Sequence, residues 1–508
     1  MNSHDFPNRT ARRTARAVLI GTLGAIGTVS AGEAVLIGGG YDLQGSQGQI
    51  ELNVRWIGDI LSEHRMRTTT FFTDGDATGP DVHYALSTDA PAGALEPIAR
   101  VFGDLVLERR RYREHAVPNV VGGTRRDTLE PALADLLERT ATDPLLLVYN
   151  GHGSQSPTSP ADVTLDLWGN TAMSARELHA LVGTHRGEGT EPFRFVFTQC
   201  YSGGFHRLAY ADPDEGLELA PAPRCGFTAE SAHRLAEGCS AGVDIGDYRD
   251  YTTFFFAALA DRERDGTVLD RDPDLDADGA VTLREAHLHT LGKAWSTDLS
   301  RSTSEDWLER WQPWQLRWLP QPASPPNNEY AELFRKLAME AGVPLDARTG
   351  RTLRTRLAED EARLGELHDE RAVLREEIAT ARRALQRRAG ERWPALLGPY
   401  TGGYRELAAS GELERIATWL TDEPDYAELH ERQERDAGLD SALLGAERDA
   451  TRTRKLLRLR HLATLKGQLE SHGSVADQAS YASLLACEET PLVIDTPPSA
   501  DTTATLED

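Results

Sequence analysis

The sequence predicts an α/β domain followed by an all-α domain. Short apolar runs such as 145–149 and 193–197 end abruptly in small and polar residues, which is typical of buried strands in a parallel sheet. From residue 327 the pattern changes to leucines at alternating steps of four and three, which predicts long helices. Because 508 residues are too many for one ordinary core, at least two domains are expected.

Composition excludes several classes of protein. The net charge is −25, from 80 acidic and 55 basic residues, which argues against nucleic acid as the main partner. Four cysteines in a chain of this length do not form a disulfide scaffold. After the amino-terminal segment, no run reaches the ~18 apolar residues that a membrane span requires.

Residues 1–31 have the pattern of a secretory signal peptide. An arginine-rich start is followed by the apolar run 17–26, and Val29-Ser30-Ala31 fits the small residues of a cleavage site. The sequence therefore predicts export to the periplasm or the medium. The alternative is a cytosolic leader or an extra strand, which would leave the protein in the cytoplasm.

His152 and Cys200 are the candidate catalytic pair. Each follows a predicted strand, and in an open α/β sheet the chemistry gathers at the carboxyl ends of the strands. An imidazole can deprotonate a thiol and later protonate a leaving amine. Gly153 leaves the backbone bare, so the Gly153 and Cys200 amides could stabilise an oxyanion. The separation (200 − 152 = 48) leaves room for a helical crossover. The alternative is a core cysteine and a capping histidine.

His152-Gly153 after one strand and Gln199-Cys200 after the next resemble the caspase and legumain group of cysteine peptidases. The resemblance covers about residues 33–300. It implies a caspase-like, mostly parallel sheet flanked by helices. It also implies that Cys200 is the nucleophile and His152 the general acid/base of an endopeptidase, with a peptide or protein as substrate. A transamidase of the same fold is the near alternative.

Residues 225–259 resemble the legumain segment that walls the primary specificity pocket. The match rests on 226–231, 237–240 and 246–248. It implies substrate-binding roles for four residues, which are Asp247, Ser240, Glu230 and Gln199; for the first three, surface solvation is the alternative. The group's early basic residue is missing, because Gln47-Gly48-Gln49 stands there. An acidic pocket without arginine favours cleavage after Arg or Lys, and cleavage after Asn stays open.

Cys225 and Cys239 are 14 residues apart (239 − 225 = 14). In an oxidising compartment they could form a disulfide that closes the pocket loop, which would leave Cys487 unpaired. In the cytoplasm all of these would be buried thiols.

Residues 274–285 match an EF-hand loop and predict a Ca²⁺ site. The side chains of Asp274, Asp276 and Asp278, the carbonyl of Ala280 and a bidentate Glu285 fall at the ligand positions. This spacing wraps oxygens around one ion. Magnesium, or an acidic turn that caps the next helix without any metal, are the alternatives.

The sequence predicts five segments. They are a signal peptide (1–31), a catalytic domain (32–300), a Trp- and Pro-rich linker (301–326), a helical domain (327–475) and a partly disordered tail (476–508). In the helical domain, a heptad stripe from Leu353 to Leu385 and a second helical run over 441–470 predict an antiparallel hairpin of coiled-coil type. The hairpin could be purely intramolecular, or it could bind a second copy or a partner.

Together these features predict an exported cysteine endopeptidase that depends on calcium. A non-catalytic, calcium-dependent interaction protein is the alternative from another class. The basic cluster 108–113 is expected to be an exposed loop or helix face, with a processing site as the alternative.

Overall fold

The computed structural model describes most of the chain. The described residues are 32–75, 78–85, 93, 95–103, 110–156, 162–187, 189–214, 216–238, 248–311, 313, 316, 325–398 and 401–492. The predicted signal peptide and residues 493–508 of the predicted tail lie outside them.

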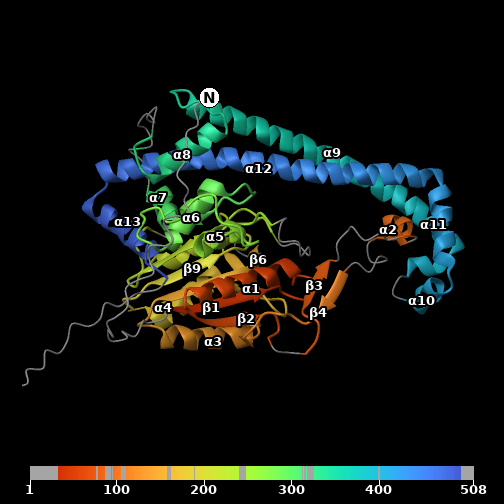
Figure 1. The fold of residues 1–508 in the computed structure, drawn as a ribbon, viewed down its shortest axis with the longest axis horizontal. Coiled ribbons are helices and arrows are strands. Elements are labelled where there is room, and N and C mark those ends of the chain that lie inside the picture. Colours follow the sequence, from red (N-terminus) through yellow and green to blue (C-terminus); the bar gives the residue numbers. More distant parts are fainter. Residues whose placement is uncertain are drawn as a thin grey trace, which may run out of the picture.

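A nine-stranded sheet forms the centre of the first domain (Figure 1). Its main path runs in the order β11-β10-β9-β6-β1-β2-β5, and β7 and β8 continue from β6. All neighbours on the path are parallel except β10 and β11. The strands are β1 (Glu33–Gly39), β2 (Arg67–Phe72), β5 (Val120–Gly122), β6 (Leu145–Gln155), β7 (Val163–Leu167), β8 (Thr171–Ser174), β9 (Phe193–Phe197), β10 (Arg224–Thr228) and β11 (Arg301–Ser302). The predicted α/β class is confirmed.

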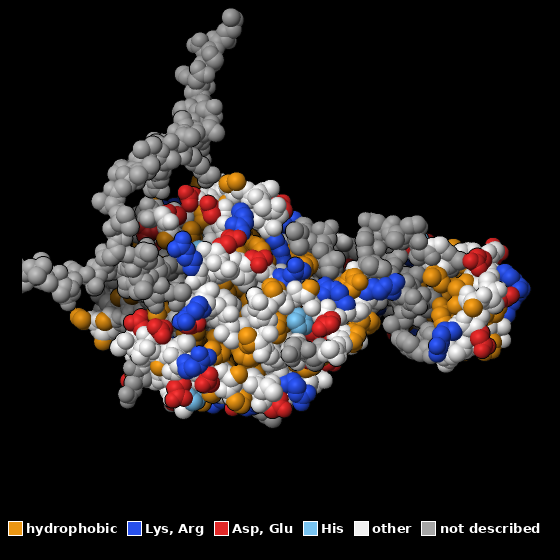
Figure 2. All heavy atoms as spheres, turned by 60° about the horizontal axis from the view of Figure 1, so that its bottom comes forward, with side chains coloured by type: hydrophobic (Ala, Val, Ile, Leu, Met, Phe, Trp, Pro, Cys, Tyr) orange, Lys and Arg blue, Asp and Glu red, His pale blue; other side chains and the backbone are white. Residues whose placement is uncertain are grey.

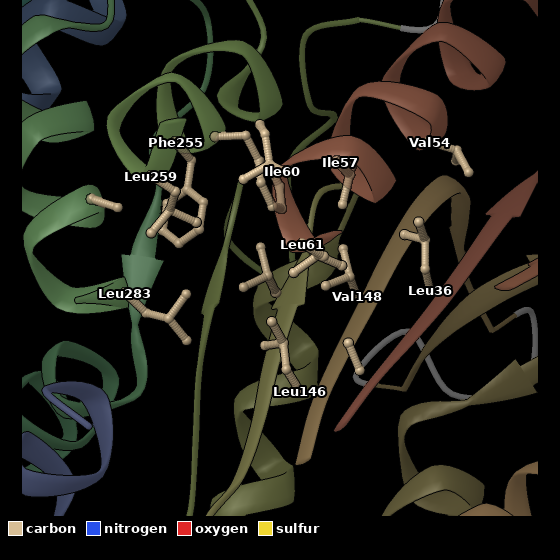
Figure 3. Close-up of a cluster of buried hydrophobic side chains, with 14 of the residues drawn as sticks. Leu36, Val54, Ile57, Ile60, Leu61, Leu146, Val148, Phe255, Leu259 and Leu283 are labelled. Carbon is tan, nitrogen blue, oxygen red and sulfur yellow. The ribbon is translucent and has the colours of Figure 1, made fainter. Parts of the chain in front are cut away.

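Helices cover both faces of this sheet because successive strand side chains point to opposite sides. Leu36 of β1 packs with one group of helices, and Ile37 packs with the other. The first group is α1 (Gly48–Glu63), α5 (Tyr251–Ala260) and α6 (Leu283–Lys293), whose packing Figure 3 shows. The second group is α3 (Arg126–Arg139), α4 (Ala175–Arg186) and the 3-10 helix η3 (Ser202–Ala209).

The second part of the chain is an arm of two long antiparallel helices, as predicted (Figure 1). The arm is α9 (Thr349–Arg392) with α12 (Pro424–His472), and η6 (Pro394–Leu397), α10 (Gly402–Ala409) and α11 (Glu412–Asp422) form its tip. In Figure 2 the tip stands apart from the body of the molecule and shows hydrophobic side chains beside charged ones. Among the described residues, every helix is too short or too polar to cross a membrane.

Two segments assigned to the linker and the tail are helical. Residues of the predicted linker form α7 (Thr303–Trp311), and residues of the predicted tail form α13 (Val475–Glu488). Both pack into one hydrophobic cluster with α12 and α8 (Glu329–Glu340), and Trp307 and Tyr481 lie inside it. Of the tryptophans in and just before the predicted Trp- and Pro-rich linker, Trp307 and Trp311 pack in this cluster, whereas Trp295 is 51% exposed. Trp314 and Trp318 lie outside the described residues.

A short helix from the first domain packs on the tip of the arm. This helix, α2 (Leu95–Phe102), lies between β3 (Val82–Ala85) and β4 (Arg110–Arg113), which form a separate two-stranded sheet. Ile98 and Val101 are fully buried among side chains of α9, α11 and α12. The basic cluster was predicted to be an exposed loop or helix face, but its residues 110–113 form β4, where Tyr112 is exposed; residues 108–109 lie outside the described residues. Arg113 at its end donates to the buried Glu51 over 2.7 Å.

The predicted Cys225–Cys239 disulfide is corrected by the structure. Cys225 of β10 is bonded to Cys487 of α13, and Cys239 lies outside the described residues. After the arm, the chain comes back to the first domain, where α13 packs against β10. This packing brings Cys487 to Cys225. Arg194 of the neighbouring β9 fixes the end of this return by donating to the carbonyls of Thr490 and Pro491.

We expect Cys487→Ser to lower the free energy of unfolding by about 2–5 kcal/mol, because it opens a loop that spans 262 residues. Urea unfolding with and without reductant measures the difference. Cys200→Ser is the matched control, since Cys200 is a free thiol. Equal midpoints for oxidised and reduced wild-type protein would contradict the bond.

Candidate active site

The pairing of β6 with β9 brings His152 and Cys200 to the same edge of the sheet. Tyr149 is the register partner of Phe197, an offset of 48 residues (197 − 149 = 48). His152 and Cys200 have the same offset, so each lies three positions beyond the last paired residues. His152 was expected past the end of its strand. Instead β6 continues to Gln155, and from His152 onward it pairs with β7.

Gly153 touches the backbone of the Cys200 turn. A side-chain carbon at Gly153 would lie 2.5 Å from the carbonyl oxygen of Cys200, a distance that no real contact allows. Glycine is therefore required here for packing against the Cys200 turn, a reason that was not foreseen from the sequence, and its predicted part in an oxyanion hole stays a prediction. Tyr201 follows with a left-handed backbone (φ 60°) and begins η3, so the chain turns sharply after Cys200. The amides predicted to form the oxyanion hole belong to these two touching segments.

The surroundings of His152 fix its tautomer. Its Nε2 lies 2.8 Å from the carbonyl oxygen of Gly45 and 2.8 Å from Oε1 of Gln47. A carbonyl oxygen only accepts, so Nε2 carries the proton and Nδ1 is left as the base. The ring of Tyr41 packs edge-on against the imidazole with centroids 5.4 Å apart. Burial lowers the pKa of His152, so the imidazole is neutral at pH 7.

Cys200 is a partly exposed thiol held by one backbone unit. The amide of Ala236 donates to Sγ over 3.3 Å, and the carbonyl oxygen of Ala236 is 4.0 Å from the sulfur. Burial raises the pKa of Cys200, and the carboxylates of Asp298 and Glu230 raise it further, while the Ala236 amide lowers it. The resting pair is therefore a neutral thiol and a neutral imidazole, and the base must act during attack.

The predicted substrate-binding residues have different outcomes. Asp247 and Ser240 lie outside the described residues. Glu230 is fully buried, and its carboxylate accepts from Arg234, from the amide of Ser231 and from the amide of Leu299, so it holds its own loop together. Gln199 is 1% exposed, and no partner for its amide group is found among the described residues.

A narrow polar cavity beside the pair was missed in the sequence. It has a volume of about 10 Å³ and lies between the end of β9, the middle of β6 and the start of α1. Gln49, Asn53, Asn150, Thr198, Glu237 and Asp250 line it. The Oδ1 atom of Asn150 is buried there without a partner in the described structure, while Nδ2 donates to Thr198. The polar residue that interrupts the apolar run just before Gly151 was the available signal.

The predicted calcium loop gathers three carboxylates. Ligand atoms of Asp274, Asp276 and Asp278 lie within 4.8 Å of one another. Asp274 accepts from the amide of Gly279, and its other oxygen is buried without a partner among the described residues. Glu285 instead accepts from the amides of Leu275 and Thr282 and caps α6, so the geometry of the helix-capping alternative is present as well. Three of the predicted ligands are thus assembled, and Glu285 would have to release amides to join them.

No protein-family model matches the chain, and no curated protein matches it in sequence.

We expect alkylation of Cys200 by iodoacetamide to be slow at pH 7 and to rise with a midpoint above the ordinary thiol pKa of 9.0. The sign follows because burial and two nearby carboxylates disfavour the thiolate, which is the reactive form. Mass spectrometry of timed samples across pH measures the rate. A midpoint below pH 8 would instead indicate a preformed thiolate–imidazolium pair.

Proposed function

We propose that the protein is a cysteine endopeptidase of the caspase and legumain type. The observation that carries the proposal is the equal offset of the β6–β9 register and of His152 and Cys200, with Gly153 touching the Cys200 carbonyl. A core cysteine with a capping histidine requires neither a shared sheet edge nor a bare backbone between the two. The fixed tautomer of His152 adds to this support, because it leaves Nδ1 free as a base.

In the proposed reaction, Nδ1 of His152 accepts the Sγ proton as the sulfur attacks the scissile carbonyl carbon. The electron pair of the carbonyl moves to oxygen, where the amides of Gly153 and Cys200 donate hydrogen bonds. Collapse of this intermediate breaks the C–N bond, and the amine leaves with the proton from His152. Gly45 and Gln47 stabilise the imidazolium that forms between these steps, because both accept from Nε2.

The thioester is then hydrolysed by the same groups. Water gives a proton to His152 and attacks the carbonyl carbon, the C–S bond breaks, and Sγ regains the proton. An amine in place of water would give a new peptide bond, so transamidation by the same acyl-enzyme is the alternative outcome. Whether water can reach the thioester decides between hydrolysis and transamidation.

We propose cleavage after Arg or Lys. The carboxylates of Asp250 and Glu237 line the cavity next to the pair, and a basic side chain would be attracted to them. Asp250 already accepts from Asn53 and Thr253, and Glu237 already forms an ion pair with Arg448 and accepts from the amide of Thr297. The cavity must therefore widen to admit a side chain. Cleavage after Asn is the competing outcome, since Asn150 and Asn53 could pair with an amide.

We also propose calcium binding at the Asp274–Asp278 loop and export of the protein. The spacing of the three carboxylates fits the ion, which prefers several oxygen ligands. The Cys225–Cys487 bond supports an oxidising compartment. Bound calcium would order the start of α6, and α6 packs against the helix α5 that begins next to the cavity.

Peptide cleavage tests the central proposal. We expect the wild-type protein to cleave fluorogenic peptides with Arg or Lys before the scissile bond. Cys200→Ala should abolish cleavage, and His152→Gln should lower kcat at least about 100-fold by removing the base. Gln433→Ala, far away on the arm, is the control. Cleavage after Asn alone would contradict the acidic pocket but keep the nucleophile.

A protein that neither cleaves peptides nor reacts with a thiol-directed acyl probe would be a non-catalytic interaction protein. Binding of a partner or a second copy to the arm would then be the main activity. Size-exclusion chromatography with light scattering detects the second copy.

We expect the midpoint of thermal unfolding to be higher in Ca²⁺ than in chelator, because the ion binds the loop in the folded state and not in the unfolded state. Asp276→Asn should remove most of this increase. Asp265→Asn, in a neighbouring exposed turn, is the matched control. An increase of equal size in both variants would place the ion elsewhere.

A further inference from the structure

The loop that faces the Cys200 sulfur is residues 234–238, here called the nucleophile loop. Its Ala236 amide donates to Sγ over 3.3 Å. At its start, the carbonyl of Arg234 accepts from the amide of Tyr201, which follows Cys200 in the chain, over 2.9 Å. The position of this loop therefore decides whether a hydrogen-bond donor faces the sulfur.

Helix α12 of the arm contacts the nucleophile loop on both sides of Ala236. Arg448 forms an ion pair with Glu237, and the two side chains are only 16% and 13% exposed. Arg234 donates to Glu447 over 3.0 Å and to Thr451 over 3.3 Å. These contacts join residues more than 200 positions apart in the sequence (448 − 237 = 211).

Residues of the first domain also form hydrogen bonds with the nucleophile loop. The buried carboxylate of Asp298 accepts from the amide of Glu237 over 2.6 Å and from the amide of Tyr251 over 2.7 Å. The amide of Thr297 donates to the Glu237 carboxylate over 2.6 Å. Glu237 thus joins α12 to the segment 297–298, and Ala236 is fixed between this junction and Arg234.

We propose that Arg448 and Glu447 of α12 are positioning residues for the nucleophile, because they hold the nucleophile loop so that the Ala236 amide faces the Cys200 sulfur. The inference rests on the proposed function for its catalytic consequence. The arm is then part of the active-site machinery, although it touches neither member of the catalytic pair directly.

The charges around Cys200 give the loss of Arg448 a definite sign. The carboxyl groups of Glu230 and Asp298, both in the first domain, act on the thiol and disfavour its ionised form. Without Arg448, the Glu237 carboxylate loses its cation, and the loop can move away from the sulfur. An unpaired carboxylate and a lost amide donor both disfavour the thiolate. The thiol should therefore ionise at higher pH.

The test compares Arg448→Met with Arg435→Met, whose guanidinium pairs with Glu370 within the arm. The first readout is the pH profile of Cys200 alkylation by iodoacetamide. We expect Arg448→Met to move the midpoint up by about 0.5–1 pH unit, so that alkylation at pH 8 slows by about 3- to 10-fold. Arg435→Met should keep the wild-type profile. Arg448→Lys, which keeps the charge, should keep most of the wild-type profile.

The second readout is peptide cleavage, where Arg448→Met should lower kcat more than it raises KM. The double charge reversal, Glu237→Arg with Arg448→Glu, should bring the alkylation profile part of the way back to that of the wild-type protein. Either reversal alone should not. Superimposable profiles for Arg448→Met and Arg435→Met would overturn the proposal. If Arg448→Met shifts the alkylation profile but the wild-type protein cleaves no peptide, the positioning role stands and the peptidase is rejected. If the wild-type protein cleaves peptides but the profile does not shift, the peptidase stands and the positioning role is rejected.

Discussion

The register between β6 and β9 is the constraint on which the rest of the molecule depends. With Tyr149 opposite Phe197, odd-numbered residues of both strands face α3 and α4, and the even-numbered Val148 and Val196 face α1 and α5. A slip of β9 by one residue relative to β6 would turn every side chain of β9 to the wrong layer. The same slip would move His152 out of line with Cys200. The packing of the core and the alignment of His152 with Cys200 are therefore fixed by one set of backbone hydrogen bonds.

Burial gives the proposed catalytic pair, His152 and Cys200, protonation states that their residue types alone do not show. The loop before α1 places the Gly45 carbonyl and Gln47 against one nitrogen of His152, and the nucleophile loop places Ala236 against the sulfur. Each partner comes from a part of the chain far from the residue that it contacts. The protein thus keeps both groups neutral at rest and places beside them the donors and acceptors that the charged intermediate of the proposed reaction would need.

Features set by local pattern could be predicted from the sequence, and features set by distant contacts could not. The apolar runs before His152 and Cys200 and the leucine spacing of the arm gave the sheet, the pair and the antiparallel hairpin. The partner of Cys225 was wrong because α13 had been counted with the tail. Ser474 and Asp477 form a capping box there and were a usable signal. The sequence around Ile98 does not show that this residue is buried on the arm, since an amphipathic pattern does not reveal which surface the helix covers.

The place of α2 has a consequence for how the chain reaches its native state. Ile98 and Val101 are made early, yet α9, which buries them, begins about 250 residues later (349 − 98 = 251). At about 5–20 residues per second of synthesis, these side chains lack their partners for some 13–50 seconds. Cys225 waits even longer for Cys487. The first domain therefore cannot be completed as a unit during synthesis, because α13 can pack against β10 only after the whole arm has been made.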